Sequence, residues 1–219
     1  MLAAPRRARL RAARLHVLVT AALCRRAWDE TAEQALRGGA DVVQLREKDL
    51  PDGELLARAV RLVALARSHS ALAIVNDRPD IARLADADGV HVGQTDLPAA
   101  AARAVVGAAR LVGVSTHTRE QVRAALADRP DYVAVGPMFS SQTKPRAETA
   151  GPELAAAALS ELGAADLHDL PLVAIGGVAL ERVAELRRAG VRCVAVCQAV
   201  IGAGDPAAAC AALRAALGE

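Results

Sequence analysis

Residues 71–92 read ALAIVNDRPDIARLADADGVHV, and this stretch holds one full repeat of the pattern that decides the fold. The apolar run 71–75 predicts a buried β-strand, residues 78–85 predict a short helix, and the run 89–92 predicts a second strand. The polar residues Asn76, Asp77 and Arg78 follow the first strand directly. Apolar strands separated by a helix are typical of a parallel sheet that is covered by helices.

The same alternation runs through the whole chain. Strands are predicted at 15–20, 41–46, 71–75, 89–92, 111–115, 132–136, 172–175 and 193–197. Helices are predicted near 28–38, 52–68, 78–85, 98–108, 118–127, 152–162, 179–189 and 205–217. Eight such units predict an α/β protein with a single-domain TIM (β/α)8 barrel over residues 15–219. A doubly wound open sheet is the alternative, but no GxGxxG follows the first strand, and polar residues follow many strands.

The composition excludes several classes of protein. The only aromatic residues are Trp28, Tyr132 and Phe139, so the chain has no platform for stacking nucleic-acid bases. A net charge of +2 is too small for a general nucleic-acid or membrane role, and no apolar run could cross a bilayer. The four cysteines lack the spacing of a zinc site or the density of a secreted disulfide scaffold. We therefore expect a cytoplasmic protein with small-molecule partners and neither nucleic acid nor membrane; a homo-oligomer is compatible with the sequence.

The first 14 residues form a separate basic segment. They contain no acidic residue and five arginines: Arg6, Arg7, Arg9, Arg11 and Arg14. The segment lacks the apolar centre of a secretory signal, although a targeting peptide or a phosphate-binding arm is also conceivable. We expect residues 1–14 to be a short N-terminal extension that is poorly ordered or weakly helical.

Lysine is almost absent from the chain. Only Lys48 and Lys144 occur among 27 basic residues, and both follow the end of a predicted strand. A compact ammonium group fits between phosphate oxygens differently from a planar guanidinium. In a barrel the loops after all strands converge on one face, where active sites lie. The two lysines therefore predict an anion site on that face, with drift in an arginine-rich composition as the alternative.

Further polar residues stand at the other strand ends. Strand alternation turns Gln44, Arg46 and Lys48 to one side, which suits a diphosphate group. Asp77 and Asp96 fit a Mg²⁺ site, because this ion is usually held by one or two carboxylates plus substrate phosphates. Taken singly, either aspartate is equally consistent with a helix N-cap.

Two more positions contribute to the predicted face. Ser115 has no evident acid partner for a Ser-His-Asp arrangement, so we expect it to donate a hydrogen bond to phosphate and not to act as a nucleophile. His91 lies within an apolar strand, and we expect it to be a hydrogen-bonded core residue.

The glycines Gly176, Gly177 and Gly202, which follow the last two strands, suit either a phosphate cup or tight turns. The polar loop 136–145 suits either a lid or a phosphate contact.

Together these segments resemble the thiamine-phosphate synthase family. The resemblance spans residues 15 to about 207, and the matching motifs are, in order, QLREK (44–48), NDR (76–78), GQTD (93–96), GVSTHT (113–118) and TK (143–144). The resemblance implies a TIM barrel enzyme of the transferase class that uses Mg²⁺. Its reaction joins a pyrimidine methyl diphosphate to a thiazole phosphate, which gives thiamine phosphate and releases pyrophosphate.

The resemblance also implies roles for individual residues. The pyrimidine diphosphate would be held by Gln44, Leu45, Arg46, Glu47, Lys48, Asn76, Ser115 and Lys144, of which Arg46, Lys48, Ser115 and Lys144 would be catalytic. Mg²⁺ would be bound by Asp77 and Asp96. The pocket for the thiazole phosphate would be lined by Ser141, Gln142, Thr143, Gly177, Cys197 and Gln198.

The chain departs from the family pattern at Cys197 and Gln198, where an aliphatic residue and Ser are usual. A thiazole tautomerase of the same superfamily is an alternative function, as is a non-catalytic regulator that binds thiazole phosphate. A tautomerase has no diphosphate to expel. The joint presence of two carboxylates and two lysines therefore favours the synthase.

Overall fold

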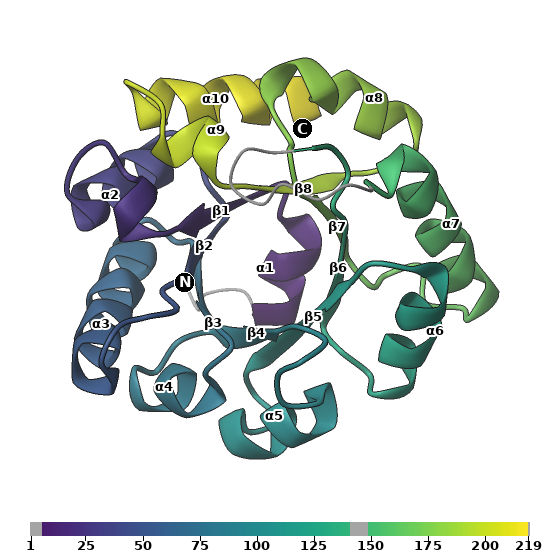
Figure 1. The fold of residues 1–219 in the computed structure, drawn as a ribbon, viewed down its shortest axis with the longest axis horizontal. Helices are drawn as coiled ribbons and strands as arrows, with labels where there is room; N and C mark the ends of the chain where they lie inside the picture. Colours follow the sequence, from purple (N-terminus) through teal and green to yellow (C-terminus); the bar gives the residue numbers. More distant parts are fainter. Residues whose placement is uncertain (1–5, 141–148, 219) are drawn as a thin grey trace.

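The computed structural model describes residues 6–140 and 149–218 as a closed barrel of parallel strands (Figure 1). The strands follow one another around the barrel in sequence order. They are β1 (Leu15–Val19), β2 (Val42–Leu45), β3 (Leu72–Asn76), β4 (Gly89–Val92), β5 (Leu111–Thr116), β6 (Tyr132–Val135), β7 (Leu172–Ile175) and β8 (Cys193–Val196). The predicted TIM barrel is confirmed.

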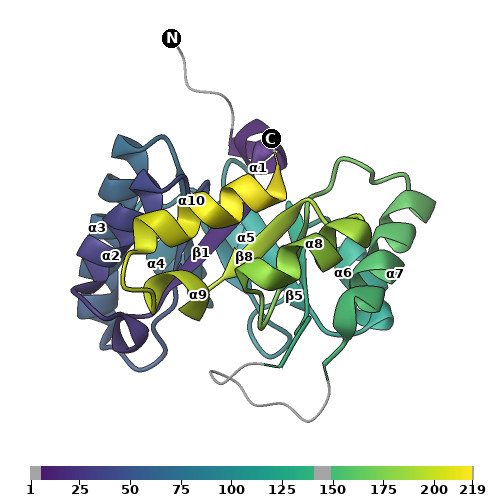
Figure 2. The ribbon, with the colours of Figure 1, turned by 90° about the horizontal axis from the view of Figure 1, so that it is seen from above.

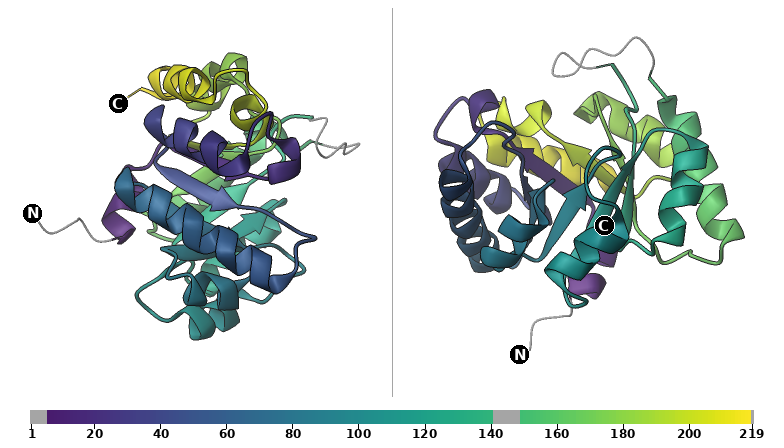
Figure 3. Two further views of the ribbon diagram at one scale, coloured as in Figure 1. Left: turned by 90° about the vertical axis from the view of Figure 1, so that its left-hand side faces the viewer. Right: turned by 60° about the horizontal axis from the view of Figure 1, so that its bottom comes forward.

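A ring of helices covers the outside of the strands (Figures 1 and 3). Its main members are α2 (Trp28–Arg37), α3 (Asp52–Ser68), α4 (Pro79–Leu84), α5 (Ala99–Val106), α6 (Arg119–Ala127), α7 (Gly151–Ala164), α8 (Val183–Arg188) and α10 (Pro206–Leu217). Shorter turns follow three strands: η1 (Ala21–Leu23), η2 (Leu180–Arg182) and α9 (Gln198–Ile201). The sequence did not predict η1 or α9, because so short an element shows no helical period. Within the described ranges, no helix has the length and apolar character needed to cross a membrane.

Each strand divides its side chains between two cores. Outward residues such as Val17, Val43 and Val75 pack beneath the helices. Inward residues such as Leu72 and Leu111 fill the barrel. Because both faces of every strand are buried, the strands are mainly apolar, and polar side chains such as Gln44 on β2 and Asn76 on β3 occupy inward positions toward their carboxyl ends.

The amino-terminal end of the barrel is closed by α1 (Arg6–Ala12), which Figure 2 shows above the strands. Leu10 is 1% exposed and Ala13 is 4% exposed, and both belong to the apolar cluster inside the barrel. Of the two forms expected for this segment, poorly ordered or weakly helical, the structure shows a helix at Arg6–Ala12, and this helix is packed against the barrel. A single leucine on a basic helix gives little sequence signal, because its burial depends on strands that are far away in the chain.

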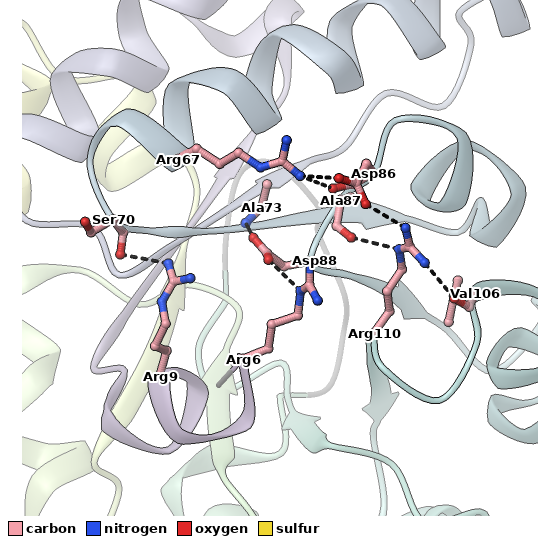
Figure 4. A network of polar contacts seen from close by, with 10 residues as sticks. All are labelled: Arg6, Arg9, Arg67, Ser70, Ala73, Asp86, Ala87, Asp88, Val106 and Arg110. Atoms are coloured by element: carbon pink, nitrogen blue, oxygen red, sulfur yellow. Dashed lines mark hydrogen bonds and ion pairs between the residues drawn. The ribbon is translucent and has the colours of Figure 1, made fainter. Parts of the chain in front are cut away.

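Ion pairs fix α1 to the starts of two strands. Arg6 Nε lies 2.8 Å from Asp88 Oδ1, and Asp88 Oδ2 accepts a hydrogen bond from the backbone N–H of Ala73 at 2.9 Å. Arg7 Nε lies 2.6 Å from Asp131 Oδ1. Figure 4 shows the Asp88 contacts within a wider set of arginine contacts at this end of the barrel. Arg6 and Arg7 of this basic segment therefore attach α1 to the barrel through ion pairs.

Replacing Leu10 by Ala should lower the free energy of unfolding by about 2–3 kcal/mol, because it removes a buried leucine and leaves a cavity at the barrel end. Chemical denaturation followed by circular dichroism measures this loss. Leu84→Ala is the matched control, since Leu84 is 67% exposed on α4, and it should change stability by less than about 0.5 kcal/mol. Equal effects of the two substitutions would contradict the assigned role of α1.

Candidate active site

A cavity of about 490 Å³ opens at the carboxyl ends of the strands. Residues from or just after all eight strands line it, beginning with Leu18 on β1 and ending with Ala199 in α9. A larger hollow of about 680 Å³ lies at the opposite end, beside α1. It contains none of the predicted site residues, and its Arg7 is already paired with Asp131. The cavity at the carboxyl ends is therefore the candidate active site.

The alternation predicted for residues 44–48 is present. Gln44, Arg46 and Lys48 line the cavity. Leu45 is 1% exposed and lies in the core beneath the helices. The carboxylate of Glu47 accepts a hydrogen bond from the backbone N–H of Ala21 at 2.8 Å and one from Arg58 at 3.1 Å. Strand alternation thus sends the side chains of Leu45 and Glu47 away from the cavity, and their part in holding the pyrimidine diphosphate stays a prediction.

Asp77 and Asp96 come together beside Lys48. Asp77 follows β3 with a positive φ of 63°, and its Oδ2 lies 3.4 Å from Lys48 Nζ. Asp96 Oδ2 accepts a hydrogen bond from the backbone N–H of Gly93 at 2.7 Å, which holds the loop after β4. Partial burial raises the pKa of Asp77, and the adjacent Asp96 carboxyl raises this pKa further, while the Lys48 ammonium acts in the opposite direction. The two carboxylates repel each other and are receptive to a cation.

These residues fit Mg²⁺. Their donors are hard carboxylate oxygens, and they are two in number, as expected for an ion that keeps several waters and takes other oxygens from a substrate. In the described part of the chain, no three His, Cys, Asp or Glu side chains form a more complete cage. Neither aspartate serves as the side-chain cap of the helix that follows it, so the N-cap alternative is not what the structure shows.

The remaining predicted residues divide into two groups. Asn76, Ser115, Gly177, Cys197 and Gln198 all line the same cavity. The residues Ser141, Gln142, Thr143 and Lys144 lie outside the described part of the chain. At the near end of that loop, a Cβ on Gly177 would come within 2.5 Å of the Phe139 carbonyl oxygen, so only glycine lets the two segments approach this closely.

Two lining residues were not assigned a role from the sequence. Gln94 Nε2 donates a hydrogen bond to the Ser115 carbonyl oxygen at 2.6 Å, which ties the loop after β4 to β5. His117 Nδ1 lies 2.6 Å from the Gly136 carbonyl oxygen. A carbonyl only accepts, so Nδ1 carries a hydrogen. Both residues occur within motifs quoted above, GQTD and GVSTHT, so the motifs contained the signal but not the role.

The floor of the cavity contains the predicted core histidine. His91 is 5% exposed, its Nδ1 lies 3.0 Å from the Tyr132 hydroxyl, and its Nε2 lies 2.7 Å from Ser115 Oγ. The expectation of a hydrogen-bonded core residue is confirmed, and His91 lines the cavity as well. Burial lowers the pKa of His91 to about 4, with Asp96 acting in the opposite direction.

Comparison with known proteins identifies the family. A family model described as "Thiamine monophosphate synthase" matches residues 15–200. The chain belongs to this family. It is 48% identical over 185 residues to a protein of Anaeromyxobacter dehalogenans named thiamine-phosphate synthase, covering 84% of this chain and 81% of that one. A protein of the same name from Roseiflexus castenholzii is 47% identical over 179 residues, covering 82% of this chain and 76% of the relative.

Solved structures agree with the sequence relatives. Thiamine phosphate pyrophosphorylase from Pyrococcus furiosus superposes with a TM-score of 0.85 and 31% identity, over 95% of this chain and 97% of that one. A 3-hexulose-6-phosphate synthase, at 22% identity and a TM-score of 0.62, shares the fold alone. The resemblance derived from the motifs is therefore confirmed at the level of the family.

A second histidine lies beneath the first. His16 is 1% exposed, and its Nε2 is a buried side-chain atom without a hydrogen-bond partner in the described residues. Burial lowers the pKa of His16 to about 3, although the negative charge of Asp41 acts to raise it. In the unfolded chain a histidine titrates near pH 6.5. Between these two values the unfolded state binds more protons, so stability is complete above pH 6.5 and falls as the pH falls.

His16→Leu should therefore reduce the pH dependence of stability. The slope of unfolding free energy against pH should fall by up to about 1.4 kcal/mol per pH unit in the acidic range. Urea denaturation at several pH values between about 4 and 7 measures the slope. Val173→Ala, in the same apolar cluster, is the control: it should lower stability equally at every pH. An unchanged slope in His16→Leu would contradict the buried, neutral state of this histidine.

Proposed function

We propose that this chain is a thiamine-phosphate synthase that joins a pyrimidine methyl diphosphate to a thiazole phosphate and releases pyrophosphate. Membership of the family makes it an enzyme of the transferase class. One observation carries the proposal: Arg46, Lys48, Asp77, Asp96 and Ser115, from the ends of four successive strands, converge on one cavity. Groups suited to an anion and to a divalent counter-ion thus line one cavity, which supports the proposal.

The reaction exchanges one bond at a methylene carbon. The bond from this carbon to the diphosphate oxygen breaks, and its electron pair leaves with pyrophosphate. The lone pair of the thiazole nitrogen then forms the new bond to carbon. The aminopyrimidine stabilises the intermediate cation, so neither a protein nucleophile nor a strong base is needed.

The cationic side chains act on the leaving group. Arg46 and Lys48 stabilise the charge that develops on the departing oxygens, and this charge is larger in the transition state than in the bound substrate. The Ser115 hydroxyl donates a further hydrogen bond, and the amides of Gln44 and Asn76 orient the substrate. Lys144 is proposed for the same anion from the sequence alone.

Asp77 and Asp96 would hold Mg²⁺ in this site. When bound, the ion neutralises charge on the diphosphate oxygens. Lys48 lies beside Asp77, so the pair keeps the ammonium at the anion end of the cavity before any ligand arrives. This arrangement distinguishes the synthase from a tautomerase, which has no diphosphate to stabilise.

The thiazole phosphate would occupy the part of the cavity near Gly177, Cys197 and Gln198. Burial raises the pKa of Cys197 to about 11, so its thiol is neutral and supplies apolar surface. Gln198 is exposed, and its side chain lies over Gly202, where a Cβ would come within 2.4 Å of Gln198 Nε2. A cytoplasmic location and Ser141, Gln142 and Thr143 as thiazole contacts stay predictions.

Incubating the purified protein with both phosphorylated heterocycles and Mg²⁺ should release pyrophosphate and form thiamine phosphate in equal amounts. Omission of either heterocycle should abolish sustained turnover, because each supplies one half of the product. A coupled pyrophosphate assay together with chromatography measures both products. Isomerisation of a thiazole phosphate without pyrophosphate release would instead identify a tautomerase and refute the proposal.

Asp77→Asn and Asp96→Asn should each lower kcat/KM by at least about 100-fold, because the carboxylate charge that attracts Mg²⁺ is lost. Asparagine tolerates the positive φ at position 77, so the backbone is preserved. Asp52→Asn is the matched control, since Asp52 lies at the start of α3 and pairs with Arg78 away from the cavity. That variant should stay within about twofold of wild type. Unchanged kinetics in both site variants would remove the metal assignment.

A further inference from the structure

Three side chains from neighbouring strands form a hydrogen-bonded chain that ends at the cavity. The Tyr132 hydroxyl on β6 lies 3.0 Å from His91 Nδ1 on β4, and His91 Nε2 lies 2.7 Å from Ser115 Oγ on β5. Tyr132 is 1% exposed and His91 is 5% exposed, whereas Ser115 is half-buried and lines the cavity. The family motifs include Ser115 but assign no role to the two residues behind it.

The sheet is built to allow this chain to form. His91 pairs in register with Gly113, and Gly113 pairs in register with Tyr132. A Cβ on Gly113 would lie 2.0 Å from Tyr132 Cζ and 2.5 Å from its hydroxyl oxygen. The phenol therefore crosses β5 through the space that Gly113 leaves, and the two rings stack with centroids 5.5 Å apart.

The direction of the hydrogen bonds follows from the phenol. Its single hydrogen needs an acceptor, because a buried hydroxyl without one is costly. In the described part of the chain, His91 Nδ1 is the only acceptor within hydrogen-bond distance of it. His16 packs its ring edge against Tyr132, but His16 Nε2 has no hydrogen-bond partner and so does not take this hydrogen.

His91 must then be the tautomer with hydrogen on Nε2. Because Nδ1 accepts from Tyr132, the remaining ring hydrogen lies on Nε2 and is donated to Ser115 Oγ. The serine oxygen is thereby occupied as an acceptor on the side of His91. Its own hydrogen is left to point into the cavity.

We propose that Tyr132 and His91 are positioning residues that hold the Ser115 hydroxyl as a permanent donor toward the anionic group of the pyrimidine substrate. This inference rests on the proposed function, because it takes the diphosphate as the acceptor. A diphosphate offers only acceptor oxygens, and a donor already aimed at them needs no reorganisation when charge develops. The polarity is opposite to that of a Ser-His-Asp triad, where histidine accepts the serine hydrogen, so Ser115 is also prevented from acting as a nucleophile.

A double-mutant cycle tests the coupling. Tyr132→Phe keeps the ring and removes the hydroxyl, which frees His91 Nε2 to accept from Ser115. Its kcat/KM for the pyrimidine diphosphate should fall about tenfold, and the KM for the thiazole phosphate should stay unchanged. Ser115→Ala should cost about 100-fold, and the double variant should be no worse than Ser115→Ala alone. An equal tenfold loss in both backgrounds would overturn the proposal, because it would show a purely structural effect.

Val173→Ala is the matched control for such a structural effect. Val173 lies in the same apolar cluster as Tyr132 and has no polar side-chain atom. Any loss it causes should be the same with and without Ser115→Ala. The cycle is repeated on the binding of inorganic pyrophosphate with Mg²⁺, which needs no catalytic turnover. Failure of the synthase reaction with intact coupling in pyrophosphate binding would count against the proposed function and leave the positioning role standing.

The tautomer can be observed in the wild-type protein, so the proposal does not depend on the folding of any variant. Heteronuclear NMR of protein with isotopically labelled histidine distinguishes hydrogen on Nε2 from hydrogen on Nδ1. The His91 signals are those that disappear in His91→Gln. Hydrogen on Nε2 in wild type, with a change in this pattern in Tyr132→Phe, is the expected result. Hydrogen on Nδ1 in wild type would overturn the proposal whatever the activity.

Discussion

The contact between Tyr132 and the bare backbone of Gly113 is the constraint that links the core of this barrel to its active site. With only three aromatic residues in the chain, the barrel interior is filled by aliphatic side chains around a single tyrosine. The ring fits because Gly113 has no side chain, and a Cβ there would overlap it. The same placement brings the phenol to His91 and, through it, to Ser115. Packing of the core and orientation of a site hydroxyl are therefore set by one contact.

Strand alternation explains which side chains of the 44–48 segment line the cavity. The sequence predicted all eight strands and placed Gln44, Arg46 and Lys48 on one side, because a period of two is visible in a single chain. Leu45 and Glu47 were included only because the family motif is a continuous run. A motif records which residues recur together, whereas the pleat decides which side chains reach the cavity, and the Glu47 carboxylate instead binds Ala21 and Arg58.

The features that the sequence did not predict depend on long-range contacts. Arg6 and Arg7 find partners 82 and 124 residues away, so a local reading of their charge suggests an unstructured segment. The direction of the chain from Tyr132 to Ser115 depends likewise on the register of three strands and on one missing side chain. Local periodicity predicts where helices and strands lie, but it says little about which polar groups, distant in the sequence, these helices and strands bring into contact.

The two ends of the barrel use charge in opposite ways, and this difference indicates where function lies. At the amino-terminal end, Asp88 is paired with one arginine and Asp131 with two, and each carboxylate also accepts a hydrogen bond from a backbone N–H group. At the carboxyl end, by contrast, Asp77 faces a second carboxylate, and among the described residues Lys48 alone pairs with it, at 3.4 Å; the pKa of Asp77 is raised, mainly by burial. Stability alone would favour pairing such groups as fully as at the other end. The carboxylates of Asp77 and Asp96 are instead suited to pair with a divalent cation, and the Lys48 ammonium is suited to pair with a polyanionic substrate.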